Sequence, residues 1–265
     1  MIRSLYTAAT GMEAQQLFMD TISNNLANVN TNGYKRARVE FQDLIYENLK
    51  SPGTTNQEGG VAPVGIEVGL GVKPGATQKD FEQGSLTQTG NNMDVAIQGD
   101  GFFQVSLPDG TMAYSRDGAF KLTSDGTIVT SSGYPVSPQI TVPNGAQQLG
   151  IDSSTGNVTA VMSGETTSTQ IGQIELARFV NPAGLKSVGN NLLLESEASG
   201  QPIVGTPGED GFKDTTLQQQ YLEASNVQVV NEMVNMISAE RAYEIVSKSI
   251  QVSEDMMQIA NNLKR

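Results

Sequence analysis

Residues 5–29, LYTAATGMEAQQLFMDTISNNLANV, carry the pattern that decides the fold of the N-terminal part of the chain. Apolar residues recur at intervals of seven positions, and a second set of residues follows each of them by three positions. The first set is Leu5, Met12, Met19 and Leu26, and the second is Ala8, Gln15, Ile22 and Val29. Because this spacing places both sets on one side of a helix, it predicts a helix with a coiled-coil seam.

The C-terminal stretch from about residue 215 to residue 263 lacks Pro and Gly and carries a second heptad series. Its members are Leu222, Val229, Met236, Tyr243, Ile250 and Met257. A separate apolar stripe consists of Ile245, Val252 and Ile259, with Met256 and Leu263 offset from it. A helix with two apolar stripes is predicted to be buried on more than one side.

Between these helices the chain has the pattern of a β domain. Residues 93–195 contain short runs such as DVAIQ, FFQVSL and NVTAVM, separated by Asp-Gly and Asn-Gly pairs typical of hairpin turns. The sequence therefore predicts an α+β fold, with a discontinuous coiled-coil domain of residues 1–32 and 215–265. An antiparallel, all-β domain covers residues 93–195, and residues 33–92 with 196–214 form an extended linking region.

Composition excludes several kinds of chemistry. The chain has 265 residues, a formal net charge of −12 and no Cys, His or Trp. It therefore cannot form a disulfide, a Ser-His-Asp triad or a His-ligated metal site, and its acidity argues against a nucleic-acid partner. We expect no enzymatic activity, no cofactor and no metal.

The N-terminus and the hydropathy pattern bear on membranes. No run approaches the roughly 18 apolar residues of a membrane-spanning helix, so no direct membrane insertion is expected. The first residues, MIRSLYTAATGMEAQQ, have no apolar core and include Glu13, so no cleaved secretory signal is expected either.

Three stretches resemble ligand sites but have simpler interpretations. The Asp-Gly pairs between residues 100 and 126 suggest a calcium-binding β-roll, but the full repeat is absent and hairpin turns explain them. The stretch GLGVKPGATQ (69–78) matches neither nucleotide-binding fingerprint. The acidic cluster of Glu209, Asp210 and Asp214 lies among Gly and Pro residues and is interpreted as solvated charge.

The end of the N-terminal helix, SNNLANVNTNGYK (23–35), is rich in Asn. The pair Asn32-Gly33 is predicted to terminate the helix, because both residues tolerate the left-handed conformation. Between residues 4 and 34 only Glu13 and Asp20 are charged. An uncharged amide face can be buried against another protein when each amide is paired, which favours an assembly surface over a solvated one.

Four segments resemble bacterial flagellar rod and hook subunits, the axial proteins of the basal body. They are ISNNLANVNTNGYKR (22–36), DVAIQGDGFFQV (94–105), YSRDGAFKLTSDG (114–126) and EASNVQVVNEMVNMISAERAYEIVSKSIQVSEDMMQ (223–258). Within this family the resemblance is to distal rod subunits. The stretch YENLKSPGTTNQEGGVAPV (46–64) is similar to a segment that hook subunits lack, and its marker residues are Tyr46, Pro52, Gly53 and Val64.

The resemblance implies a structural subunit of the flagellar distal rod. Such subunits polymerise helically into a rigid, hollow drive shaft that transmits torque to the hook. The implied partners are further copies of the chain, proximal rod subunits, hook subunits, the surrounding ring proteins and the flagellar export apparatus. The implied location is the basal body, across the periplasm, after export without a cleaved signal peptide.

Two alternatives stay open on the sequence alone. The first is a hook or proximal-rod subunit of the same family. The second, of a different class, is a secreted β-domain binding module or glycosidase on a helical stalk. It would need an aromatic-lined or carboxylate-paired cleft, and only 6% of the residues are aromatic.

The predicted assembly interface combines heptad positions with the amides. It consists of Leu5, Met12, Met19, Ile22, Asn24, Asn25, Leu26, Asn28, Val29, Leu222, Val229, Met236, Tyr243, Ile250 and Met257.

Overall fold

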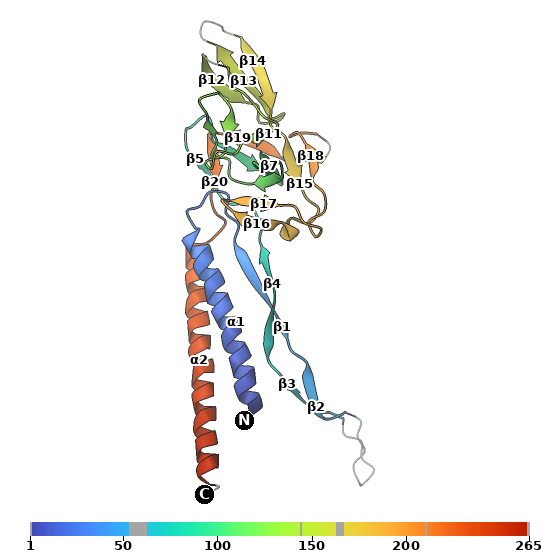
Figure 1. The fold of residues 1–265 in the computed structure, drawn as a ribbon, viewed down its shortest axis with the longest axis vertical. Helices are drawn as coiled ribbons and strands as arrows, with labels where there is room; N and C mark the ends of the chain where they lie inside the picture. The colour runs from blue at the N-terminus through green and yellow to red at the C-terminus, as the bar shows by residue number, and fades with distance from the viewer. Residues whose placement is uncertain (1, 53–62, 144, 163–166, 210, 264–265) are drawn as a thin grey trace. The chain divides into compact units, whose positions relative to one another are not determined.

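A computed structural model of the chain describes residues 2–52, 63–143, 145–162, 167–209 and 211–263. It confirms the α+β class, with a helix near each end and antiparallel strands between them. The described residues form two compact units (Figure 1). The first contains the two helices and residues 37–78, and the second contains residues 28–36 and 79–227.

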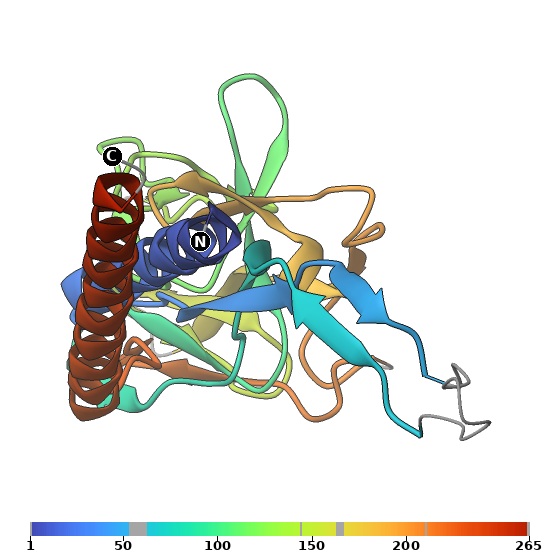
Figure 2. The same ribbon diagram turned by 90° about the horizontal axis from the view of Figure 1, so that it is seen from below.

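The first unit is a helix pair with a long two-stranded ribbon. Helices α1 (Ile2–Ala27) and α2 (Val229–Asn262) lie side by side and run in opposite directions (Figures 1 and 2). In the ribbon, β1 (Ala37–Asp43) pairs with β4 (Val72–Lys79), and β2 (Tyr46–Lys50) pairs with β3 (Ile66–Gly69). The heptad prediction for α1 is thus confirmed as a helix, which ends at Ala27.

The second unit is a β structure of several small sheets. Its largest sheet has the strand order β16-β17-β8-β7-β15-β18, with β11 also paired to β7. These strands are β7 (Phe102–Ser106), β8 (Met112–Ser115), β11 (Val136–Ser137), β15 (Leu176–Arg178), β16 (Lys186–Gly189), β17 (Leu192–Leu194) and β18 (Ile203–Gly205). A 3-10 turn, η1 (Pro182–Gly184), precedes β16.

Smaller sheets complete this unit. A three-stranded sheet has the order β12-β13-β14, and three pairs are β19-β6, β20-β5 and β10-β9. The strands are β5 (Leu86–Gln88), β6 (Val95–Gln98), β9 (Lys121–Leu122), β10 (Ile128–Val129), β12 (Ala146–Ile151), β13 (Asn157–Met162), β14 (Ser168–Gln173), β19 (Thr216–Gln219) and β20 (Tyr221–Glu223).

The core of the second unit lies between these sheets. Phe103, Ile97, Leu176 and Leu217 are completely buried in one cluster of large apolar side chains. The ring of Phe103 packs edge-to-face on Phe120 with 5.0 Å between centroids, an arrangement that aromatic pairs favour. Removal of these apolar side chains from water is the main term that stabilises the unit.

The C-terminal helix is shorter than its heptad pattern predicts. It begins at Val229, whereas residues 216–223 form β19 and β20. Leu222 therefore belongs to a strand, where it pairs with Thr87 and is buried in the second unit. Its spacing from Val229 is coincidental, because strand pairing here outweighs helix propensity.

Residues 196–214 also differ from the expected linker. They contain β18, which pairs with β15, and Phe212, which is buried in the core cluster. Asp210 lies outside the described residues.

Candidate assembly surface

The seam between α1 and α2 buries mainly small side chains. Ala14 on α1 and Ala239 and Ser253 on α2 are buried, together with Ile22, which is 1% exposed. Small residues allow two helix backbones to approach closely. The larger heptad residues are only half-buried: Leu5, Met12, Met19 and Leu26 on α1, and Met236, Tyr243, Ile250 and Met257 on α2. Val229, at the start of α2, is exposed.

The second stripe of α2 remains in solvent. Ile245 is 67% exposed and Ile259 60% exposed, and Val252 between them is also exposed. Further exposed large apolar residues of α2 are Val229, Val230, Met233, Val234, Ile237 and Met256, and Leu263 directly after the helix is exposed as well. Apolar surface of this extent is unusual for a soluble monomer and is typical of an interaction surface.

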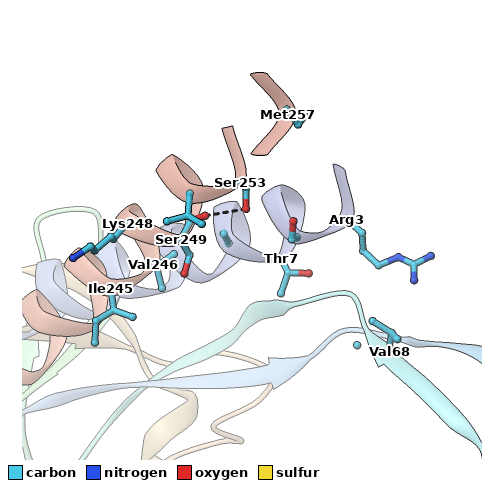
Figure 3. A pocket seen from close by; sticks show the side chains of 13 residues that line it. Arg3, Thr7, Val68, Ile245, Val246, Lys248, Ser249, Ser253 and Met257 are labelled. Atoms are coloured by element: carbon cyan, nitrogen blue, oxygen red, sulfur yellow. Dashed lines mark hydrogen bonds between the residues drawn. The ribbon is translucent and has the colours of Figure 1, made fainter. Parts of the chain in front are cut away.

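A groove of about 1600 Å³ lies beside this stripe, between α1, α2 and β3 (Figure 3). Its lining residues are Arg3, Ser4, Thr7, Ala8, Val68, Gly69, Ile245, Val246, Lys248, Ser249, Val252, Ser253 and Met257. The Ser253 hydroxyl donates to the Ser249 carbonyl oxygen at 2.9 Å, so its polar group is satisfied within the helix. The groove can therefore accept an apolar occupant without leaving that hydroxyl unpaired.

The ribbon carries further exposed apolar side chains. Ile45, Tyr46, Leu49 and Ile66 are exposed around the β2–β3 pair, and Val64 is 75% exposed. A two-stranded ribbon is marginally stable alone, so it gains from contact with another surface. Of the predicted linking-segment residues, Tyr46 lies in β2, Pro52 and Val64 are exposed, and Gly53 lies outside the described residues.

The amides at the end of α1 do not form one face. Asn25 is 2% exposed, donates through Nδ2 to the Ala37 carbonyl and accepts from the Ala37 N–H, both at 2.9 Å. It therefore joins α1 to β1 within the chain, contrary to the predicted amide surface. Asn28 accepts a hydrogen bond from Thr31 Oγ1 at 3.1 Å, and Asn24 is exposed.

The pair Asn32-Gly33 has a different role from the one predicted. Helix α1 has already ended at Ala27, so this pair is not its terminator. Gly33 has φ of +67°, and a Cβ there would lie 2.7 Å from the backbone of Arg116. Its N–H donates to the Glu223 carbonyl at 2.8 Å. Glycine is required because the backbone is left-handed and another segment passes close to it.

Three buried charged side chains lie next to this turn, and the sequence patterns do not reveal them. Lys35 Nζ lies 2.5 Å from Glu223 Oε1, and Arg116 Nη1 lies 3.5 Å from Glu223 Oε2. Burial lowers the pKa of Lys35, an effect that the Glu223 carboxylate opposes. The cluster joins the turn after α1, the strand β20 and the segment after β8, which are far apart in sequence.

Within residues 2–52, 63–143, 145–162, 167–209 and 211–263, no group of three or more Asp and Glu side chains is placed to hold a metal ion.

In the same part of the chain, neither helix has a stretch long and apolar enough to span a bilayer.

Family models match three parts of the chain. Residues 5–35 match "Flagella basal body rod protein", residues 96–160 match "Flagellar hook protein FlgE/F/G D1 domain", and residues 218–263 match "Flagellar basal body rod FlgEFG protein C-terminal". The first and third contain α1 and α2, and the second lies within the β unit.

Full-length relatives agree with these matches. The chain is 51% identical over 266 residues to the flagellar basal-body rod protein FlgG of Borreliella burgdorferi, with complete coverage of both. It is 46% identical to FlgG of Agrobacterium fabrum over 265 residues, covering 99% of this chain and all of the relative. It is 30% identical over 280 residues to the flagellar hook-basal body complex protein FlhP of Bacillus subtilis, again with complete coverage.

Proposed function

This chain belongs to the FlgG family of flagellar basal-body rod proteins, and we propose that it is a structural subunit of the distal rod. In this role it polymerises helically into a rigid, hollow shaft that transmits torque to the hook. The hook and proximal-rod alternatives are not favoured, since the relatives with the higher identities are FlgG proteins over their full length. The module or glycosidase alternative has no support among the relatives.

The observation that carries the proposal is the exposed stripe of α2, Ile245–Val252–Ile259. Helix α1 covers a different side of α2, and the described residues of the first unit leave this stripe exposed. A neighbouring copy seated here would remove this apolar surface from water. Each Å² of apolar surface buried contributes about 25 cal/mol, so the contact would have a substantial driving force. Because the stripe and its neighbour's contact surface are different patches, the contact is heterologous and extends into a helical polymer.

The finer features of this role are part of the same proposal. The partners are other copies of this chain, proximal rod and hook subunits, the ring proteins and the export apparatus, and the location is the basal body across the periplasm. We also propose an inner domain of α1 and α2, a linking region around the β1–β4 ribbon and an outer β domain. No catalytic step is assigned, because a torque-bearing polymer needs rigidity rather than chemistry.

The test is a charge placed in the stripe. The Val252→Asp variant should remain monomeric at concentrations where the wild-type chain forms straight tubes in negative-stain electron microscopy. An unpaired carboxylate buried at an interface costs several kcal/mol, enough to abolish assembly. The matched control is Gln251→Asp, which places the same group one residue away on an exposed polar position.

The variants separate folding from assembly. Circular dichroism of dilute Val252→Asp should match the wild type, because Val252 is exposed in the isolated chain. Tubes of normal length formed by Val252→Asp, or their loss in Gln251→Asp as well, would contradict the assignment of this stripe.

A further inference from the structure

A second, smaller cavity lies in the β unit. Its lining residues are not those of the apolar stripe on α2, and they include charged side chains. It has a volume of about 230 Å³, and Lys35, Lys79 and Arg116 contribute to its wall. The rest of the wall comes from Asn28, Gly33, Tyr34, Phe81 and the turn of residues 187–193, with no carboxylate among the lining residues. Three cations therefore meet around one small space.

The positive charge here is incompletely balanced. Among the described residues, Glu223 is the one carboxylate that forms an ion pair with Lys35 or Arg116, and it pairs with both. Nε and Nη1 of Arg116 are buried without a hydrogen-bond partner among the described residues. A buried cation that lacks a full counter-charge is costly, so the cluster favours an additional anion nearby.

Lys79 increases this excess. It is half-buried, burial lowers its pKa, and no ion pair to it is found within the described ranges. Its Nζ lies 5.9 Å from the centre of the Tyr34 ring. A cation over an aromatic face is attracted to it, but the ring supplies no full negative charge.

Two neighbouring carboxylates, Asp80 and Asp100, also act electrostatically on Lys35 and Arg116 respectively, but each is ion-paired with another arginine, Asp100 with Arg178 at 3.4 Å. Asp80 pairs with Arg36 at 3.2 Å. Asp117 accepts from the Ala119 N–H at 3.1 Å and from Asn191 Nδ2 at 3.4 Å. The unbalanced charge is therefore available to a group from outside the unit.

The turn that borders the cavity is held in an uncommon backbone conformation. Gly189, Asn190 and Asn191 have φ of 92°, 52° and 60°, all in the left-handed region. Asn191 is fixed by donating to the Asn32 carbonyl at 3.2 Å and by accepting from Ser115 Oγ at 2.9 Å. Asn190 and Asn191 form the two-residue turn between β16 and β17, where positive φ is favoured, and these hydrogen bonds fix the position of the cavity wall.

We propose that this cavity receives a carboxylate side chain from a neighbouring copy of the chain, with Lys79 as the residue that binds it. This inference rests on the proposed polymerisation. A second copy suits the site because the chain has 28 Asp and Glu against 16 Lys and Arg, so each copy presents an excess of carboxylates. The volume admits a side chain but not a helix or strand, so the contact adds register and specificity to the apolar one.

Zero-length cross-linking tests the contact directly. A carbodiimide joins an amine to a carboxylate only where the two touch. Polymers grown from a mixture of ¹⁵N-labelled and unlabelled subunits are treated with it, digested and analysed by mass spectrometry. We expect a Lys79 cross-link to an Asp- or Glu-containing peptide in pairs of mixed isotope composition, which identifies a bond between copies.

Two substitutions give the functional readout. Lys79→Gln should raise the critical concentration for polymerisation by at least about tenfold, since a charge-assisted hydrogen bond is lost. Lys79→Arg keeps the charge and should assemble at close to the wild-type concentration while losing the cross-link. Both variants should keep the wild-type circular dichroism spectrum as monomers, because Lys79 contributes no ion pair to the described fold.

The outcomes are distinct. A cross-link at Lys79 confined to single copies, or Lys79→Gln assembling at the wild-type concentration, overturns the inference. Inorganic phosphate, compared with chloride at equal ionic strength, should compete and raise the wild-type critical concentration more than that of Lys79→Gln. If phosphate instead lowers it, the site takes a free anion and the inference is overturned. A wild-type chain that never polymerises contradicts the proposed function itself, and the inference with it.

Discussion

The core of the β unit and the α1–α2 seam bury different kinds of side chain. In the β unit the fully buried residues are large, such as Phe103, Ile97 and Leu176. In the helix pair they are mostly small or polar, such as Ala14, Ala239 and Ser253, and large apolar side chains remain exposed. The β unit therefore buries its large apolar side chains within itself, whereas the helix pair leaves large apolar side chains exposed, as interaction surfaces do.

A substitution that creates a cavity in the β core should have the largest effect and therefore tests this difference most directly. Phe103→Ala removes a completely buried ring and should lower the free energy of unfolding of the β unit by about 4 kcal/mol. Amide hydrogen exchange of peptides from β7 and β8, read by mass spectrometry, measures it.

The matched control is Ile259→Ala on α2. The side chain is exposed, so the monomer's stability should change by no more than about 0.5 kcal/mol. A comparable loss of protection from both substitutions would mean that the helix pair is as complete as the β core.

The next largest effect concerns the buried charges. Glu223→Gln removes the carboxylate that, among the described residues, pairs with both Lys35 and Arg116, and it leaves two buried cations without that partner. We expect a loss of about 3 kcal/mol in the stability of the β unit, measured by the same exchange experiment. Glu197→Gln, at an exposed position, should leave it within about 0.5 kcal/mol of the wild type. Equal changes in stability from Glu223→Gln and Glu197→Gln would show that the buried charged cluster makes no specific contribution to the stability of the β unit.

The smallest predicted effect lies at the end of α1. Asn25→Ala removes two hydrogen bonds to the Ala37 backbone. The N–H and carbonyl of Ala37 then lose that partner. The cost should be about 2 kcal/mol, seen as faster exchange of the β1 amides. Gln16→Ala, an exposed amide on the same helix, is the control, and β1 exchange unchanged by Asn25→Ala would refute the role assigned to Asn25.

Heptad spacing correctly located α1, most of α2 and the stripe that α1 leaves uncovered. It failed at Leu222, which has the right spacing but pairs with Thr87 in a strand. The uncharged amide face, a separate pattern, predicted Asn25 as an assembly residue, although its amide bonds to Ala37 within the chain. In both cases a residue's local pattern was compatible with two partners, and only the folded chain selects between them.

The sequence by itself determined the two helical ends, the β-rich middle and the presence of more apolar surface than one helix pair can bury. These follow from local periodicity and turn residues, which act over a few positions. The tertiary structure alone decided where strand pairing takes over from the helix pattern and which charges are buried. It brings Lys35 to Glu223 across 188 positions, and it places Lys79 and Arg116 around one cavity. Such meetings depend on long-range packing, which leaves no periodic trace in the chain.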